Sequence, residues 1–286
     1  MSLSSLLDVP APAKLNLFLH IVGRRPDGYH LLQSVFVLID WADTLHFERR
    51  ADGQLRRHDL GPALPADDLS LRAARLLQAR SGCTLGADIS VDKQVPWGAG
   101  MGGGSSDAAT TLLALNRLWG LGWSRAQLLA VAPELGADVP FFVGGDNAFV
   151  EGIGEQLSPI EVPAQRYVVV KPQASLATAE IFSHPLLTRD TKLSILRGSL
   201  ADTSFGCNDL QPPAEDRCSE VAQVARWLET RFGNSRMTGS GSAVFARVDS
   251  GRNAPPLAID LTDLPSGWVG RECRGLASHP LRAWAD

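Results

Sequence analysis

Cysteine and histidine are scarce in this chain of 286 residues, and neither is arranged for a metal cluster or a disulfide framework. The four cysteines form no C-x-x-C pair, and the six histidines are scattered in the same way. We therefore expect no structural zinc site, and isolated thiols suit a reducing cytoplasm. The cysteines are Cys83, Cys207, Cys218 and Cys273.

The chain also lacks a basic surplus and long apolar runs. Its 27 Lys and Arg against 31 Asp and Glu give a net charge of −4, which makes nucleic acid a poor partner. No apolar stretch reaches the roughly 18 residues of a membrane span, and none precedes Lys14. We expect neither a membrane segment nor a signal peptide, and hence a cytoplasmic protein. With 44% hydrophobic residues, the chain can bury the core of two domains or of one large one.

Glycine, by contrast, is concentrated in one stretch, VPWGAGMGGGSSDAA at residues 95–109. Each ordered glycine costs roughly 0.5–1 kcal/mol in backbone entropy, so a packed core does not favour such a run. Apolar residues at helical spacing follow, and Ser105, Ser106 or Asp107 is the expected N-cap. Because a helix N-terminus and bare glycine backbone both favour anions, the stretch predicts a cradle for nucleotide phosphates. Its glycines are Gly98, Gly100, Gly102, Gly103 and Gly104.

Three familiar phosphate motifs do not fit this stretch. A Walker A loop ends in Gly-Lys-Ser/Thr, but no lysine occurs between Val95 and Arg117. A G-x-G-x-x-G pattern is present, but no acidic residue for a ribose occurs between Ala108 and Pro133, which argues against NAD. The HRD and DFG sequences of protein kinases are absent as well. A glycine-rich linker is disfavoured, because a strand pattern precedes the stretch and a helix pattern follows it.

The first clear strand pattern covers residues 13–23, where apolar and polar side chains alternate. Lys14 and Asn16 point to the same side of this strand, roughly 7 Å apart. Taken alone, they are most simply two polar residues on an exposed face. A Pro-Asp-Gly turn follows, and then a strand near residues 31–39. Tyr29 and His30 lie at that junction, either as a turn-edge pair or as a platform for a planar ring.

The rest of the chain mixes helices and strands. Strands are expected at residues 43–50, 86–93, 147–151, 166–171 and 268–274, and helices at 67–80, 107–119, 124–132, 178–182 and 215–232. Residues 51–65 are predicted to form a polar connection, and residues 184–213 an irregular stretch. Asp138 precedes Val139 and Pro140, so an N-cap is its structural explanation. Composition shifts near residues 153–163, which divides the chain into residues 1–157 and 158–286.

Three widely separated blocks resemble the three motifs of the GHMP kinases. They are PAKLNLFLHI from Pro12, PWGAGMGGGSSDAA from Pro96 and MTGSGSAVFA from Met237. Any one block is weak, but three in the right order over nearly the whole chain are specific. Within the superfamily, residues 12–30, the glycine stretch and LGADVPFFV at residues 135–143 are similar to the kinases of a cytidine-diphosphate sugar alcohol.

The resemblance implies ATP- and Mg²⁺-dependent phosphorylation of the 2-hydroxyl of 4-diphosphocytidyl-2-C-methyl-D-erythritol, a step of non-mevalonate isoprenoid biosynthesis. It also implies an α+β fold of two domains, with the active site in the cleft between them. The family's catalytic lysine and aspartate match Lys14 and Asp138. The aspartate can accept the hydroxyl proton while the lysine orients the hydroxyl and offsets negative charge. A small-molecule substrate is the implied partner, with no nucleic acid and no membrane, for a monomer or homodimer.

Binding residues follow from the same resemblance. ATP is expected to contact Lys93, Pro96, Gly98, Gly100, Gly102, Gly103, Gly104, Ser105 and Ser106. The substrate is expected to contact Asn16, Tyr29, His30, Thr178, Phe182, Gly239 and Ser240. Among these, Tyr29, His30 and Phe182 match aromatic positions that hold the cytosine ring. Adenine contacts in the family lie near Lys93 and the DDL segment at residues 67–69.

Some features depart from the family pattern or leave alternatives open. Asp68 stands where relatives often have asparagine, and a carboxylate lacks the donor of an amide. No carboxylate motif for Mg²⁺ is evident, so its ligands are unknown, and we expect ATP phosphates with hydroxyls such as Ser105 or Ser106. The alternative activity is that of another GHMP kinase, of the homoserine or mevalonate type. A catalytically silent nucleotide-binding module is a third reading, but it predicts loss of Lys14 or Asp138.

Overall fold

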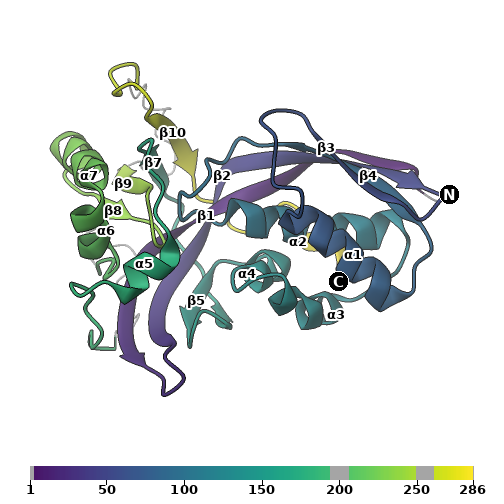
Figure 1. The fold of residues 1–286 in the computed structure, drawn as a ribbon, viewed down its shortest axis with the longest axis horizontal. Coiled ribbons are helices and arrows are strands. Elements are labelled where there is room, and N and C mark those ends of the chain that lie inside the picture. The colour runs from purple at the N-terminus through teal and green to yellow at the C-terminus, as the bar shows by residue number, and fades with distance from the viewer. Residues whose placement is uncertain (1–2, 194–205, 249–260, 286) are drawn as a thin grey trace.

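Two β-sheets with helices packed against them make up the α+β architecture of this chain (Figure 1). The computed structural model describes residues 3–193, 206–248 and 261–285. The first sheet has the order β3-β4-β2-β5-β6, and β1 pairs with β2. Its strands are β1 (Ser5–Arg24), β2 (His30–Arg50), β3 (Leu55–Asp59), β4 (Gly86–Asp92), β5 (Ala148–Glu151) and β6 (Gln156–Pro159).

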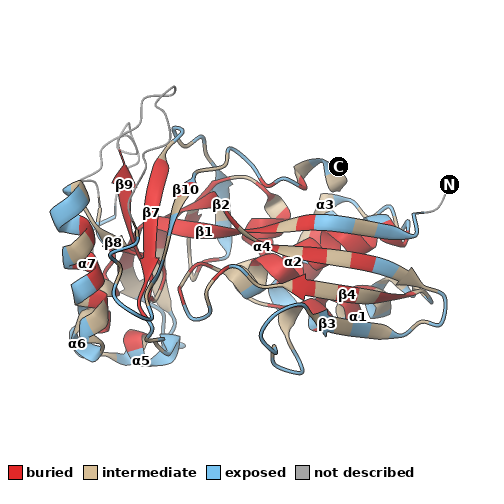
Figure 2. Ribbon diagram, turned by 90° about the horizontal axis from the view of Figure 1, so that it is seen from above, coloured by how far each residue is buried: buried red, intermediate tan, exposed pale blue. Residues whose placement is uncertain are grey.

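Helices of the first half cover one face of this sheet and form the larger core with it (Figure 2). They are α1 (Leu69–Ser81), α2 (Gly103–Leu118), α3 (Arg125–Val131), the short 3₁₀ turn η1 (Ala132–Glu134) and α4 (Val139–Gly144). Helix α2 is central, since 12 of its 16 residues are buried and it contacts β1, β2, α1 and α4. Burial on nearly all sides explains why its sequence, rich in Ala, Leu and Thr, carries few charges.

The second sheet has the order β10-β7-β9-β8 and is antiparallel. Its strands are β7 (Arg166–Lys171), β8 (Arg236–Met237), β9 (Val244–Val248) and β10 (Val269–Arg274). Helices α5 (Thr178–Ser183), α6 (Gln211–Arg217) and α7 (Ser219–Phe232) belong to this half, and the turn η3 (Arg282–Trp284) ends the chain. The amphipathic α7 places Val221, Val224 and Leu228 in a core with β7 and β9.

The long strands β1 and β2 connect the two halves. Leu15 and Leu17 of β1 lie in a core shared with β7 and β9, whereas Leu19 and Ile21 lie in the core under α7. Since packed structure surrounds the middle of β1, its polar face is buried as well, and Lys14 and Asn16 are only 3% and 1% exposed. The simple expectation of an exposed polar face for this pair is therefore wrong.

Several predicted elements are confirmed. Ser124 caps α3 through a full capping box with Gln127, as expected of a serine before a helix. The strands predicted at residues 86–93, 147–151, 166–171 and 268–274 correspond to β4, β5, β7 and β10, and the helix at 178–182 corresponds to α5. The α+β class is confirmed too.

Other elements differ from the sequence patterns. The strands predicted at 31–39 and 43–50 are one continuous strand, because β2 follows β1 throughout its length and register shifts absorb the irregularity near Pro12. The helix predicted at 215–232 is two helices, α6 and α7, separated by extended backbone at Cys218. Strand β3 lies in residues 51–65, which were predicted to be a polar connection, and β6 lies in residues 153–163, which were predicted to be a domain boundary. Of the stretch predicted as irregular, residues 194–205 lie outside the described residues.

Among the described residues, no helix is both long and apolar enough to cross a membrane.

Candidate active site

The glycine stretch feeds directly into the N-terminus of α2. This helix begins at Gly103, with Gly102 as its N-cap at a left-handed φ of 71°. The predicted cap at Ser105, Ser106 or Asp107 is wrong, because glycine at position 102 adopts a backbone conformation that turns the chain into the helix earlier. The first N–H groups of a helix have no partner within it, so they are free to bind an anion here.

A second glycine turn packs against the back of this loop. Ser242 N–H donates to the carbonyl of Gly98 at 2.9 Å, and Ala243 N–H donates to that of Ala99 at 3.2 Å. A Cβ atom added to Gly100 would lie 2.2 Å from the carbonyl oxygen of Thr238. Glycine is therefore required at position 100 by the approach of another backbone. Two of the three sequence blocks that resemble GHMP kinase motifs thus meet in space.

A pocket of about 310 Å³ lies in front of the loop. One side is formed by the glycine loop and the other by residues 64–72 before and within α1. Predicted ATP residues that line it are Lys93, Pro96, Gly98, Gly100, Gly102, Gly103 and Gly104. The predicted adenine segment, represented by Asp68 and Leu69, lines it too. The volume falls at the lower end of the range for small-molecule sites.

Trp97 and Arg72 are among the pocket residues that were not singled out from the sequence. Trp97 lines the pocket with 56% of its surface exposed, which is unusual for so large an apolar side chain. Arg72 of α1 lines the opposite side. A tryptophan inside a glycine stretch was the available signal for the first, and nothing in the helical pattern marked the second.

Ser105 and Ser106 are not among the residues that line the pocket. Ser106 is fully buried in the first turn of α2, and its hydroxyl has no hydrogen-bond partner in the described part of the chain. A Cβ atom added to Gly136, two residues before Asp138, would lie 3.9 Å from the Ser105 hydroxyl oxygen. The Ser105 hydroxyl is therefore near the segment that carries Asp138.

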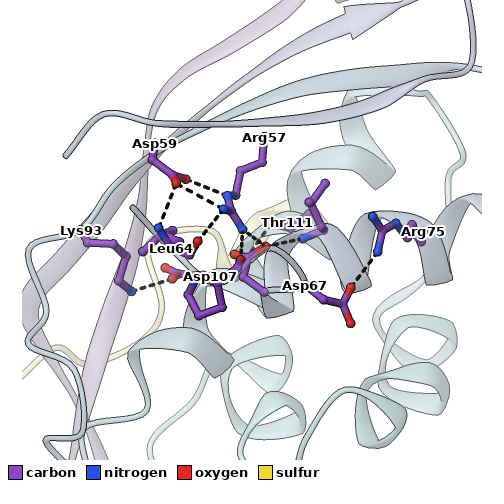
Figure 3. Close-up of polar contacts among 11 residues, drawn as sticks. Arg57, Asp59, Leu64, Asp67, Arg75, Lys93, Asp107 and Thr111 are labelled. Atoms are coloured by element: carbon purple, nitrogen blue, oxygen red, sulfur yellow. Dashed lines mark hydrogen bonds and ion pairs between the residues drawn. The ribbon is translucent and has the colours of Figure 1, made fainter. Parts of the chain in front are cut away.

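Lys93 is held between two buried carboxylates, Asp43 and Asp107, and Figure 3 shows its contact with Asp107. Its ammonium pairs with Asp43 and, at 2.6 Å, with Asp107. Burial works against the charged lysine, but the two carboxylates outweigh it and raise the pKa of Lys93. Burial also raises the pKa of Asp107 to about 8. Asp107 therefore ionises less readily than a free aspartate, and the Lys93 ammonium offsets carboxylate charge beside the phosphate cradle.

Asp43 is the better stabilised of the two carboxylates. Its Oδ1 accepts the backbone N–H groups of Gln94 and Val95 at 2.6 and 2.7 Å. By contrast, Asp107 Oδ1 is buried without a partner in the described residues. The cluster consequently anchors the start of the glycine loop to β2.

Lys14 and Asp138 lie together beside the N-terminus of α2. Lys14 Nζ is 3.6 Å from Asp138 Oδ2, and it donates to Asn16 Oδ1 at 2.6 Å. The ammonium also lies 4.4 Å from the ring centre of Phe36. Burial lowers the pKa of Lys14, and the nearby carboxylate of Asp138 opposes that shift. The two residues that the family resemblance predicts as a pair are therefore adjacent in the structure.

Asp138 occupies the N-cap position of α4 without capping the helix. Its side chain makes no cap hydrogen bond, and 31% of it is exposed, so the carboxylate faces away from the helix backbone. A Cβ atom at Gly102 would lie 3.4 Å from Lys14 Cε. The pair is therefore adjacent to the glycine that starts α2, and thus to the end of the phosphate cradle.

Asn16 joins the first and third sequence blocks. Its backbone N–H donates to Thr238 Oγ1 at 2.9 Å, and Thr238 Oγ1 donates to Asn16 Oδ1 at 3.2 Å. Its side-chain amide donates to Ser34 Oγ on β2. Lys14 N–H donates to the carbonyl of Met101 in the glycine loop. The second and third blocks therefore both contact the first block, at Lys14 and Asn16 of β1.

The predicted ring site is partly assembled. The rings of His30 and Phe182 are 5.3 Å apart with 33° between their planes, although they come from β2 and α5. Arg189 Nε donates to His30 Nε2 at 3.3 Å, and burial, Arg189 and Arg24 lower the pKa of His30. A neutral imidazole is the form suited to stacking with a base.

The remaining predicted substrate residues lie at two places. Tyr29 is 62% exposed, next to His30 in the chain. The hydroxyls of Thr178 and Ser240 share a hydrogen bond of 2.8 Å, which links α5 to the second glycine turn. Gly239 in that turn is buried against Gly100, since a Cβ atom there would lie 2.7 Å from the Gly100 carbonyl oxygen.

Comparisons with known proteins identify the family. Residues 68–146 match the GHMP kinases N terminal domain, and residues 195–258 match the GHMP kinases C terminal model. A curated protein of Methylibium petroleiphilum, 4-diphosphocytidyl-2-C-methyl-D-erythritol kinase, is 63% identical over 286 residues and covers 100% of both chains. The chain belongs to the GHMP kinases. Its predicted resemblance to that branch of these kinases is confirmed.

Solved GHMP kinases agree with this assignment. A crystal structure of 4-(cytidine 5′-diphospho)-2C-methyl-D-erythritol kinase is 33% identical, with a TM-score of 0.79 over 95% of this chain and 99% of the other. Homoserine kinase from Cytophaga hutchinsonii has a TM-score of 0.70 over 98% and 96%, but only 16% identity, so it supports the fold alone. This GHMP kinase is an ATP-dependent small-molecule kinase with the two-domain α+β fold of its family.

Proposed function

We propose that this kinase transfers the γ-phosphoryl group of ATP to the 2-hydroxyl of 4-diphosphocytidyl-2-C-methyl-D-erythritol. The reaction belongs to the non-mevalonate route to isoprenoid precursors. The observation that carries the proposal is the Lys14–Asp138 pair, 3.6 Å apart, beside the helix N-terminus that ends the glycine loop. The relatives at high identity over full length support the choice of acceptor.

The pair supplies what phosphoryl transfer asks of a protein. We assign Asp138 as the base that accepts the hydroxyl proton while the hydroxyl oxygen attacks the γ-phosphorus and ADP leaves. We assign Lys14 to orient that hydroxyl and to offset charge on the transferred group. Its hydrogen bond to Asn16 fixes the ammonium, and the low-dielectric surroundings strengthen its field.

ATP is assigned to the pocket in front of the glycine loop. Lys93, Pro96 and the loop glycines line that pocket. Ser105 and Ser106 do not line it, but they lie in the first turn of α2, next to the loop. In the described part of the chain, no three His, Cys, Asp or Glu side chains are grouped to hold a metal. The buried, unpartnered hydroxyl of Ser106 nevertheless fits Mg²⁺ held chiefly by phosphate oxygens. Bound Mg²⁺ neutralises charge that develops on the transferred group.

The acceptor is assigned to the side of the second glycine turn. The His30 and Phe182 rings, with the exposed Tyr29 beside them, supply stacking surface for cytosine. Asn16, Thr178, Gly239 and Ser240 supply polar groups for the sugar alcohol and its phosphates. These residues come from both halves of the chain, as a site between two domains requires.

The decisive assay is ADP release with purified protein, ATP and Mg²⁺. The acceptors 4-diphosphocytidyl-2-C-methyl-D-erythritol, mevalonate and homoserine are supplied one at a time. Turnover with the cytidine compound alone is expected. Turnover with a different acceptor would keep the Lys14–Asp138 chemistry but remove Tyr29, His30 and Phe182 from the ring site.

Replacement of the proposed base tests the mechanism. Asp138→Asn keeps the size of the side chain but cannot take up the proton, so kcat should fall by about 10²–10⁴-fold. ATP affinity should stay near the wild-type value, because Asp138 is outside the nucleotide pocket. Titration calorimetry with ATP provides the control for folding and nucleotide binding. A variant with wild-type kcat would show that Asp138 is not the base.

A further inference from the structure

The outer wall of the nucleotide pocket is built from a segment without regular structure. Leu64, Pro65 and Asp68 line the pocket opposite the glycine loop, and they belong to the connection between β3 and α1. A connection of this kind has no ladder of strand hydrogen bonds to fix its position. Side chains must therefore hold it if the pocket is to keep its shape.

Arg57 of β3 makes those contacts (Figure 3). Its guanidinium donates to the Asp59 carboxylate at 2.7 and 3.2 Å, to the carbonyl of Pro65 at 2.7 Å and to that of Leu64 at 3.2 Å. It also pairs with Asp68 at 2.9 Å. The Arg57 side chain is 8% exposed, and that of Asp68 is 9% exposed. One buried cation thus joins a strand, a loop and the residue before a helix.

The two carboxylates extend these contacts. Asp59 Oδ2 accepts the N–H of Leu64 at 2.9 Å, so the loop is held from both sides of its backbone. Asp68 Oδ1 accepts the N–H of Leu71 at 3.1 Å and caps α1. The carboxylate of Asp68 therefore has an ionic partner as well as its role as a cap. A carboxylate pairs with a guanidinium more strongly than an amide does.

The charges of this cluster are directed into the protein rather than into solvent. A guanidinium presents five N–H donors in a rigid plane, and Arg57 uses them on three segments at once. An ammonium has three donors around one point and cannot reproduce that arrangement. The nearby Arg75–Asp67 pair is different, since its side chains are 57% and 68% exposed. Exposed pairs of that kind contribute little.

We propose that Arg57 is a positioning residue for ATP binding, which fixes the outer wall of the nucleotide pocket without lining the pocket itself. The inference rests on the assignment of ATP to this pocket. Because ATP affinity is measured without an acceptor, it is independent of which alcohol the kinase phosphorylates. Failure of the acceptor assignment would therefore leave the role of Arg57 standing.

The test compares Arg57→Gln, Arg57→Lys and the control Arg75→Gln in the full chain. We expect Arg57→Gln to raise the Kd for ATP, measured with Mg²⁺ by titration calorimetry, by about tenfold or more. Arg57→Lys should lie between this variant and the wild type, and Arg75→Gln should match the wild type. At saturating ATP, kcat and the KM for the acceptor should return to within about twofold of wild type.

Two results would overturn the proposal. One is an unchanged Kd for ATP in both Arg57 variants. The other is a loss of kcat at saturating ATP that equals the loss of ATP affinity, because general damage to the fold would act on both. If Arg57→Gln does not fold, the milder Arg57→Lys gives the same decision through its ratio of KM change to kcat change.

Discussion

At the scale of single residues, Lys93 shows how a residue at a binding pocket can hold the structure together. We predict that Lys93→Met lowers the free energy of unfolding by about 3–5 kcal/mol, because it leaves Asp43 and Asp107 buried without their cation. Urea unfolding at pH 7 measures this. A loss confined to ATP affinity, with unchanged unfolding, would show that the lysine serves the nucleotide alone.

The double variant Lys93→Met with Asp107→Asn is the matched control. Removing the second carboxyl should recover part of the stability, since Asp43 keeps its two backbone donors. Asp107→Asn alone removes one of the two carboxylates that share the ammonium, so it should cost less stability than Lys93→Met, which leaves both without a cation. The three unfolding energies together give the coupling between the two residues.

Which residues belong to the site could be predicted better than how buried those residues are. The resemblance to the GHMP kinases paired Lys14 with Asp138, whereas alternation in β1 alone suggested that Lys14 and Asn16 were exposed. Alternation reports one covered face, and it cannot reveal that the glycine loop, Asp138 and Thr238 cover the other. Arg57 had no signal at all, because its role depends on a loop and a helix cap that only the fold brings to it.

At the scale of elements, the helices with caps and the strands with clear alternation were predictable. Ser124 and the α7 pattern mark their helices through local chemistry. Strand β3 was missed because it is a half-exposed edge strand, LRRHD, which has no apolar face and, among the described strands, pairs with β4 alone. The early start of α2 was missed because serine and aspartate gave a stronger local signal than a glycine in left-handed conformation.

The contact between the two glycine turns gives a prediction at this scale. Gly100→Ala should destabilise the protein by about 2–4 kcal/mol, since it forces alanine to a φ of 73° and a Cβ atom against the Thr238 carbonyl. Gly144→Ala in α4 is the control, because nothing lies within 4 Å of its added Cβ. Thermal unfolding of both variants provides the comparison. Equal melting temperatures would mean that the two turns separate at little cost.

At the scale of the whole molecule, the chain returns to its first half at the end. The division at residues 157 and 158 remains our proposal for the order of the two domains along the chain. The last segment nevertheless crosses it, because Gly275 bridges to Ile39, Ser278 bridges to Asp146, and Leu281 lies in the core with α2. Figure 1 places both termini on the side of the first sheet. The C-terminal segment therefore belongs structurally with the helices of the first half.

His279 makes the packing of the C-terminal segment against the first half dependent on pH. It is buried, its backbone N–H donates to the carbonyl of Gly145, and its Nδ1 accepts the N–H of Leu281, which requires a neutral ring. Burial and the charge of Arg125 lower the pKa of His279 to about 4. The unfolded chain therefore binds the proton more readily between about pH 6.5 and pH 4, and the free energy of unfolding falls as pH falls through that window.

His279→Gln should remove this part of the acid sensitivity. Other acidic groups titrate equally in both proteins, so the difference between their pH profiles isolates the histidine. From the pKa difference we expect the wild type to lose up to about 3 kcal/mol more than the variant between pH 7 and pH 4. Urea unfolding at half-unit steps of pH measures both profiles. Parallel profiles would mean that the C-terminal segment opens before the imidazole is protonated, and that its attachment is weaker than the buried contacts of Leu281 suggest.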